Sequence, residues 1–255
     1  MIIAITAQKG GTGKTTTAAT MAAGLTLKGY KVLLIDLDQQ GSLSFICKAD
    51  ATGKTTLGIL TREITAEEAI QPVEIADIIP ANKALAGAEA VLKETGGEYR
   101  LKEALEPIKG KYDFIIIDCP PALGSLTINA LTAANKVIVP AQADVLSLAG
   151  ITQLYDSCKL VKKYTNKELE IAGILLAKHS NRTVLKRDLE EVLREQLSQQ
   201  MQSKVYTATI REAVAINEAQ YMQQSLFSYA GNSKVAEDYR AFIEEFLQDI
   251  KAKRG

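Results

Sequence analysis

The stretch Gln8-Lys9-Gly10-Gly11-Thr12-Gly13-Lys14-Thr15-Thr16 decides the fold of this chain. It stands between a short apolar run, residues 2–5, and an alanine-rich segment with a helical pattern. The glycines allow backbone N–H groups to turn toward an anion at the start of a helix, where the helix dipole also favours negative charge. Within this stretch we expect Lys14 to reach the β- and γ-phosphates of a nucleotide and the Thr15 hydroxyl to hold Mg²⁺.

The loop departs from the strict P-loop pattern at its beginning. That pattern has glycine where this chain has Gln8, and a second lysine, Lys9, follows. Two ammonium groups at one phosphate would repel each other, so Lys9 is poorly suited to assist Lys14. We therefore expect Lys9 to reach phosphates that are bound by a facing subunit.

Length and composition bound the fold and the partners. The chain has 255 residues, is 47% hydrophobic and carries 30 basic and 30 acidic side chains. This fits one large domain over residues 1–255, with no separate N-terminal DNA-binding domain. Because the net charge is zero, binding to a polyanion has to come from a local patch. The three cysteines are widely spaced, which favours a reducing cytoplasm over a disulfide framework.

Short β-branched runs alternate with longer helical patterns along the chain. Strands are expected at 2–6, 31–36, 77–80, 112–118, 136–140 and 171–177. Helices are expected at 14–28, 83–93, 101–109, 127–134, 147–163, 184–200 and 232–251. This alternation predicts an α/β fold, a doubly wound and mostly parallel central sheet with helices on both faces.

Acidic residues follow two of these strands. Asp118 ends the apolar strand 112–118, and Asp36 and Asp38 follow the strand 31–36. Because ligands collect at the carboxyl ends of parallel strands, we expect these carboxylates to converge on the phosphate loop. We assign Asp36 and Asp118 to the Mg²⁺ shell with Thr15, and Asp38 to positioning the attacking water. If the chain is still extended at Asp38, that carboxylate faces the same way as Asp36.

A second copy of the loop's last five residues occurs at Thr52-Gly53-Lys54-Thr55-Thr56. The residues before it supply no further glycine and no clear strand. One glycine cannot build a ring of inward N–H groups, so we expect a surface turn followed by a short helix.

These motifs resemble the deviant Walker A superfamily and, within it, the ParA/Soj partition ATPases. The loop 9–16 resembles the family's first motif, 36–42 its second and 113–130 its third, and the likeness continues to residue 182. The resemblance implies that Lys14 and Thr15 bind ATP and Mg²⁺, that Lys9 contacts the phosphates across a nucleotide-sandwich homodimer, and that Asp38 activates water.

The resemblance also implies a function. It is that of an ATPase switch for partitioning plasmid, chromosome or mobile-element DNA. The ATP-bound dimer would bind double-stranded DNA nonspecifically on the nucleoid, and hydrolysis would be slow until a ParB-like partner stimulates it. Two departures stand out. Gln39 replaces the family's usual proline, and Ala215 stands near the place of a DNA-binding arginine, with Arg211 a few residues earlier.

DNA binding is expected at a local basic segment. Eight positive residues lie between positions 159 and 187. Asn181-Arg182-Thr183 resembles the family segment whose arginine contacts DNA, and we name Arg182, Lys186, Arg187 and Arg211 as candidates. No aromatic residue lies between Arg182 and Arg187, so contacts to phosphates are expected rather than base stacking. A solvated lysine face is the alternative interpretation.

Two other functions remain open. The relative MinD ends in a basic amphipathic helix that binds membranes, and Phe242, Ile243, Phe246, Leu247 and Ile250 form an apolar stripe here. Acidic residues lie between them, so we expect the stripe to pack on the core and predict no stable membrane association. The other alternative is a metabolic or regulatory ATPase that uses the same dimer without DNA.

Overall fold

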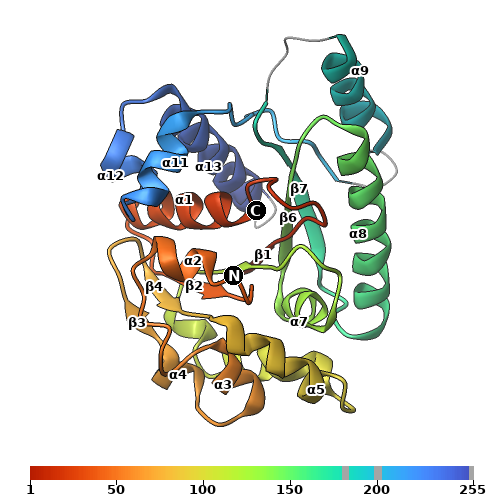
Figure 1. Cartoon of the computed structure of the whole chain (residues 1–255). Helices are drawn as coiled ribbons and strands as arrows, with labels where there is room; N and C mark the ends of the chain where they lie inside the picture. Colours follow the sequence, from red (N-terminus) through yellow and green to blue (C-terminus); the bar gives the residue numbers. More distant parts are fainter. Residues whose placement is uncertain (180–183, 198–202, 253–255) are drawn as a thin grey trace.

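The computed structural model describes residues 1–179, 184–197 and 203–252, and seven strands in these ranges form one sheet (Figure 1). Their order is β3-β4-β2-β5-β1-β6-β7. All neighbouring pairs are parallel except β3 with β4. The strands are β1 Ile2–Ile5, β2 Val32–Asp36, β3 Gln71–Pro72, β4 Asp77–Ile79, β5 Phe114–Asp118, β6 Lys136–Ala141 and β7 Glu170–Leu176. The doubly wound fold expected from the sequence is confirmed, and all six expected strands are present within one or two residues at each end.

Successive residues of a strand point to opposite faces of the sheet, and both faces are covered, so the strands are buried on both sides. Ile3 and Ile116 belong to one hydrophobic cluster, whereas Ala4 and Ile117 belong to the other. Every residue of β1, β2 and β5 is buried. This explains why these strands appear in the sequence as continuous apolar runs rather than as alternating patterns.

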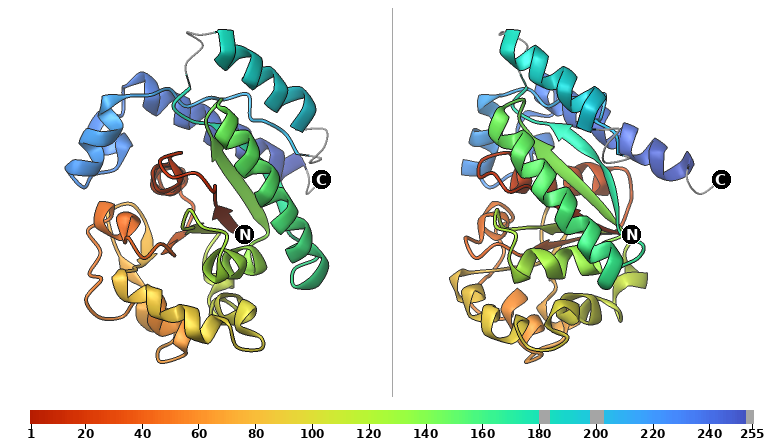
Figure 2. Two further views of the ribbon diagram at one scale, coloured as in Figure 1. Left: turned by 45° about the vertical axis from the view of Figure 1, so that its right-hand side comes forward. Right: turned by 90° about the vertical axis from the view of Figure 1, so that its right-hand side faces the viewer.

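Helices cover both faces of the sheet (Figure 2). One face packs against α1 and α13, and the other against helices that include α7 and α8. The α-helices are α1 Lys14–Leu27, α2 Ser42–Ile46, α3 Thr56–Thr61, α4 Ala66–Ala69, α5 Ala88–Leu92, α6 Arg100–Leu105, α7 Ser125–Ala133, α8 Val145–Tyr164, α9 Val184–Val192, α11 Val214–Tyr221, α12 Leu226–Ala230 and α13 Lys234–Ala252. Short 3₁₀ turns are η1 Lys83–Gly87, η2 Gly97–Tyr99 and η3 Lys109–Lys111, and a π-turn, η4, spans Leu193–Leu197.

Several expected helices differ in extent. The helix expected at 83–93 is the 3₁₀ turn η1 followed by α5. Helix α6 ends at Leu105, short of the expected residue 109, because Pro107 has no N–H to continue the helical hydrogen bonds. Helix α9 ends at Val192 and continues as η4, and residues 198–200 of the expected helix lie outside the described ranges. The second copy at 52–56 is a turn followed by the short helix α3, as expected.

The apolar stripe of α13 packs on the core. Phe242, Ile243, Phe246 and Leu247 are all buried, and Ile250 packs partly buried against the same cluster. The expectation of core packing is confirmed, and these side chains are not on the surface to insert into a membrane. Within the described residues, no helix is both long enough and apolar enough to cross a membrane.

Candidate functional site

The loop between β1 and α1 forms an anion cradle. Gly11 and Gly13 have φ values of 72° and 91°, in the left-handed region that favours glycine. Gly13 is the N-cap of α1 and has no side chain to accept from the first-turn N–H groups. These donors, at the positive end of the helix dipole, suit a phosphate group.

Lys14 is directed into this cradle. Its side chain is buried, and its Nζ lies 3.5 Å from the carbonyl oxygen of Lys9. Burial lowers the pKa of the ammonium, while the carboxylates of Asp118 and Asp38 act in the opposite direction. The loop therefore places one buried cation among the acidic side chains that the sequence singles out.

Two buried carboxylates face each other at the ends of neighbouring strands. Asp36 and Asp118 are register partners in β2 and β5, and both are fully buried. Among the described residues, neither carboxylate oxygen of Asp118 has a partner at good hydrogen-bond geometry, although the Thr15 hydroxyl lies close enough to lower its pKa. Burial and the nearby Asp36 raise the pKa of Asp118 well above its ordinary value, which the Thr15 hydroxyl and Lys14 oppose only in part. An unpaired buried carboxylate is costly, so this position favours a bound cation.

Asp36 is tied to the loop that follows it. Its Oδ2 accepts hydrogen bonds from the backbone N and the Oγ of Ser44, at 2.8 and 2.7 Å. Burial raises the pKa of Asp36 to about 6, although these hydrogen bonds act to lower it. Ser44 Oγ also accepts from the backbone N of Ala81, so one serine joins two strand ends. We did not predict Ser44, because nothing in a serine eight residues after an aspartate indicates this contact.

The chain turns at residues 39–40, shortly after Asp36. Strand β2 ends at Asp36, and the backbone N of Asp38 donates to Asp36 Oδ1 at 3.1 Å. The backbone N of Leu37 still donates to the carbonyl of Asp118 at 3.0 Å, one residue beyond the end of β2. The N of Gly41 donates to the carbonyl of Asp38 at 2.9 Å, which closes a turn with Gln39 exposed at the position of the family's proline. Asp38 is half-buried and close enough to Lys14 to affect its pKa.

Lys9 is directed away from the cradle. Its Nζ lies 2.7 Å from Oδ2 of Asp144, the N-cap residue of α8. Its carbonyl oxygen, by contrast, faces the loop and accepts from Thr12 Oγ1 at 3.4 Å. We did not predict Asp144. Asp-x-x-Ser before a helical pattern does indicate a helix cap, but not a partner 135 residues away.

The remaining threonine of the loop contacts the C-terminal part of the chain. Thr16 Oγ1 accepts from Nε2 of Gln220 at 2.8 Å. Gln220 belongs to α11, a helix that we did not predict. The contact joins the start of α1 to a segment about 200 residues later in sequence, which no local pattern reveals.

The candidate DNA-binding residues are only partly described. Arg182 lies outside the described residues, and Lys186 and Arg187 lie in the first part of α9, residues 184–187, of which only the backbone is described. Arg211 is described. Its Nε and Nη2 both donate to the carboxylate of Asp238 at 2.7 Å, so its planar end is already engaged.

The fold divides the basic run at 159–187 into two groups. Lys159, Lys162 and Lys163 lie near the C-terminal end of α8, whereas α9 lies beyond the opposite end of that helix (Figure 1). A helix of 20 residues, the length of α8, is about 30 Å long. The continuous run in the sequence is therefore not one continuous patch on the surface.

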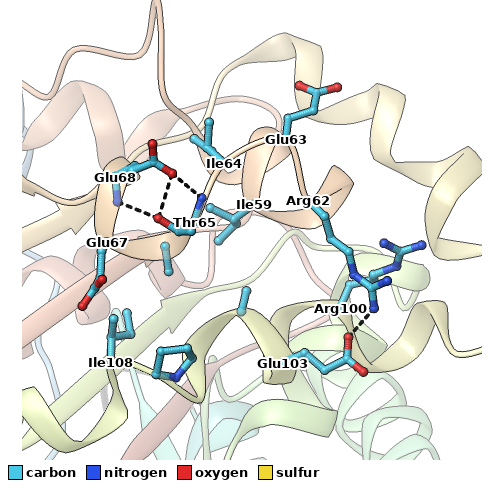
Figure 3. Close-up of a pocket in the computed structure, with 13 residues that line it drawn as sticks. Ile59, Arg62, Glu63, Ile64, Thr65, Glu67, Glu68, Arg100, Glu103 and Ile108 are labelled. Atoms are coloured by element: carbon cyan, nitrogen blue, oxygen red, sulfur yellow. Dashed lines mark hydrogen bonds and ion pairs between the residues drawn. The ribbon is translucent and has the colours of Figure 1, made fainter.

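A cavity of about 380 Å³ lies between α3, α4 and α6 (Figure 3). Arg62 at its edge is paired with Glu103, and Glu68 accepts from Thr65 in the cap of α4. These charged groups are already partnered, and the residues of the phosphate loop do not line the cavity. It is therefore separate from the nucleotide site.

Comparison with known proteins identifies the family. A family model described as an AAA domain matches residues 1–171. Soj of Bacillus subtilis, a sporulation initiation inhibitor protein, is 42% identical over 250 residues, which cover 96% of this chain and 97% of Soj. The chromosome partitioning protein ParA of Caulobacter vibrioides is 38% identical over 262 residues, covering 99% and 97% of the two chains.

A solved structure shares the whole fold. Cobyrinic acid a,c-diamide synthase of Mycobacterium smegmatis, crystallised with ADP and magnesium, superposes with a TM-score of 0.84 at 35% identity, over 99% of this chain and 96% of that one. With the phosphate loop, the paired strand-end aspartates and these full-length relatives together, the chain belongs to the ParA/Soj family of partition ATPases.

Proposed function

We propose that this protein is an ATP-dependent, dimerising ATPase switch that partitions DNA. In the proposed cycle, ATP bound in the cradle of each protomer brings two protomers together. In the cytoplasm, the dimer binds double-stranded DNA of the nucleoid, and hydrolysis separates the protomers again. Hydrolysis is slow until a ParB-like protein bound to a centromere-like site stimulates it.

The donor set fits Mg²⁺ and ATP. Burial raises the pKa of both Asp36 and Asp118, the charge of Asp36 raises that of Asp118 further, and the buried Lys14 lies close enough to Asp118 to affect its pKa. No group of three potential His, Cys, Asp or Glu ligands occurs in the part of the chain that the structure describes. This fits Mg²⁺, which keeps several waters and uses few protein ligands together with phosphates. Thr15, Asp118 and Asp36 would hold the ion, which neutralises phosphate charge when bound.

The orientation of Lys9 is the observation that carries the dimer. Lys14 fills the cradle, while the ammonium of Lys9 lies outside it at the start of α8. A cation supplied to a phosphoryl-transfer site from a second subunit can raise the rate by about 10³–10⁵. Lys9 is the residue of this chain that suits that role, and Asp38 is the residue that we assign to the attacking water.

The proposal also includes DNA binding, at residues outside the nucleotide site. The candidates are Arg182, Lys186 and Arg187, with Arg211 a weaker one because Asp238 holds its guanidinium. Dimerisation would bring two such segments onto one DNA duplex, so ATP would control avidity rather than the strength of each contact.

An electrophoretic shift assay tests this function. Double-stranded DNA should be retarded with ATP and Mg²⁺ but not with ADP, and Asp38→Ala should prolong the complex because it slows hydrolysis. The logarithm of the affinity should fall with the logarithm of salt concentration, at a slope of roughly −0.9 per phosphate contacted. Binding that is equal with ADP, or indifferent to salt, contradicts the proposal.

One comparison favours a second candidate function. The Mycobacterium smegmatis relative is named as a biosynthetic enzyme, so a metabolic ATPase without DNA binding fits the same fold. In that case the protein would dimerise and hydrolyse ATP, but DNA would neither bind nor alter the rate. The shift assay therefore separates the two candidates.

A further inference from the structure

The ammonium of Lys9 is held within its own chain. Lys9 Nζ lies 2.7 Å from Asp144 Oδ2, and the two side chains are 31% and 32% exposed. The carbonyl oxygen of Lys9 faces the cradle instead, 3.4 Å from Thr12 Oγ1 and 3.5 Å from Lys14 Nζ. The side chain of Lys9 therefore extends from the loop toward the start of α8.

Asp144 is itself fixed. Its Oδ1 accepts from the backbone N of Ser147 at 2.9 Å as the cap of α8, and its Oδ2 also accepts from Ser147 Oγ at 3.2 Å. The first turns of α8 pack closely on the loop, since a Cβ at Gly150 would lie 3.4 Å from the Cβ of Gln8. Asp144 is thus a positioned anion beside Lys9 rather than a mobile surface carboxylate.

The surroundings of this ion pair are suited to a second protomer. Val145 and Leu146, which follow Asp144, are 63% and 71% exposed. Two adjacent apolar side chains at a helix start, next to the one cation of the loop that lies outside the cradle, form a surface that another protein can cover. Reaching a phosphate on that second protomer would require Lys9 to leave Asp144 or to share its charge.

The geometry points to Asp144 as an internal counter-ion that holds Lys9 in the monomer and opposes ATP-dependent dimerisation. This inference rests on the proposed function, in which Lys9 contacts the phosphates bound by the partner subunit. Asp144 and those phosphates are both anions, so they compete for one ammonium group. The contact would set how much ATP and protein are needed before the switch closes.

The expected size follows from the exposure of the pair. Partly exposed ion pairs shift an equilibrium by about 1.4- to 5-fold. A symmetric dimer breaks two of them, so removing the charge of Asp144 should tighten dimerisation by about 2- to 30-fold.

Asp144→Asn isolates this charge, because asparagine is an equally good N-cap and can still accept from Ser147. Sedimentation velocity with Mg²⁺ and a non-hydrolysable ATP analogue gives the dimer dissociation constant without interference from hydrolysis. We expect a constant about 2- to 30-fold lower than that of the wild type. Ser147→Ala, which loosens Asp144 but keeps its charge, should change the constant in the same direction by less.

A matched control is available on the same helix. Asp156 pairs with Lys159 at 3.2 Å, so Asp156→Asn removes the same charge far from Lys9 and should leave dimerisation unchanged. ADP affinity, measured by calorimetry, should stay within about twofold in Asp144→Asn, because a surface pair outside the cradle has little effect on the monomer's own nucleotide.

The outcomes separate this inference from the function on which it rests. A wild-type protein that stays monomeric with the ATP analogue contradicts the proposed dimer itself. A wild type that dimerises while Asp144→Asn dimerises equally or less tightly overturns the role of Asp144. Equal tightening by Asp156→Asn also overturns it, because net charge alone would then explain the effect.

Discussion

The same five residues, Thr-Gly-Lys-Thr-Thr, occur at 12–16 and at 52–56 and adopt different structures. At the first copy, Gly13 has a φ of 91°, Lys14 is buried and a helix of 14 residues begins at Lys14. At the second copy Lys54 is exposed, and a helix of six residues begins only at Thr56.

The difference lies in what surrounds each copy. The first follows a buried strand and two further glycines, which bring it to the edge where Asp36 and Asp118 end their strands. At the second, Thr56 Oγ1 donates to the carbonyls of Asp36 and Pro80, which fastens α3 to the same edge. The first copy thus contributes N–H donors and a lysine to the site, while the second contacts the backbone at the ends of the neighbouring strands. A phosphate site depends on the strand, the glycines and the opposing carboxylates together.

The largest expected difference between the two copies is in nucleotide binding, when the lysine of each is replaced. Lys14→Ala should weaken binding of Mg²⁺ and ATP by roughly 10- to 150-fold, the range for a lost hydrogen bond to a charged group. Lys54→Ala should change it by less than about twofold, because an exposed lysine outside the cradle has no phosphate to contact. Calorimetric titration with a non-hydrolysable ATP analogue measures both. Equal losses in the two variants would contradict the difference between the copies.

Asp118→Asn tests the contribution of the buried carboxylates at the first copy. Removing an unpaired buried charge should stabilise the nucleotide-free protein by about 1–3 kcal/mol. Because folding raises the pKa of Asp118, the cost of its charge is absent at low pH and reaches its full size as pH rises through the folded-state pKa. The melting temperature of the variant should therefore exceed that of the wild type most at pH 8 and least near pH 4.

Magnesium and ADP should reverse that order, because only the wild type retains the carboxylate that would hold the ion. Thermal unfolding at several pH values, with and without Mg²⁺ and ADP, measures both effects. A wild type that is more stable than the variant at pH 8 without nucleotide would show that Asp118 is satisfied in some other way.

The smallest expected effect separates the two glycines. Gly13→Ala forces a residue with a Cβ into the left-handed region, which should cost about 1–2 kcal/mol of folding free energy. Gly53 is not among the positive-φ glycines, and a Cβ there would meet no atom within 4 Å. Gly53→Ala should therefore be neutral within about 0.5 kcal/mol. Urea denaturation compares them, and similar losses would mean that the two turns are alike.

Much of the fold follows from sequence because its signals are local. Apolar runs such as 114–117 give the central strands, and the parallel connections then bring Asp36 and Asp118 to one edge. The strand β3 was not predicted, since two residues, Gln71 and Pro72, carry no alternation and pair only because β4 lies beside them.

The contacts that fix the site could not be predicted because no local sequence pattern specifies them. Asp36 with Ser44, Lys9 with Asp144 and Thr16 with Gln220 all depend on the finished fold. The basic run at 159–187 shows the opposite problem. Residues that are close in sequence are separated in space, because α8 connects the parallel strands β6 and β7 and runs from the carboxyl ends of the strands back to their amino ends.

Lys9→Ala tests directly whether this phosphate loop is half of a site that two protomers share. The measurement is sedimentation velocity of the wild type and the variant, both saturated with Mg²⁺ and a non-hydrolysable ATP analogue. We expect the wild type to sediment as a dimer, and Lys9→Ala to bind the analogue yet sediment as a monomer. A Lys9→Ala protein that dimerises as the wild type does would contradict the shared site.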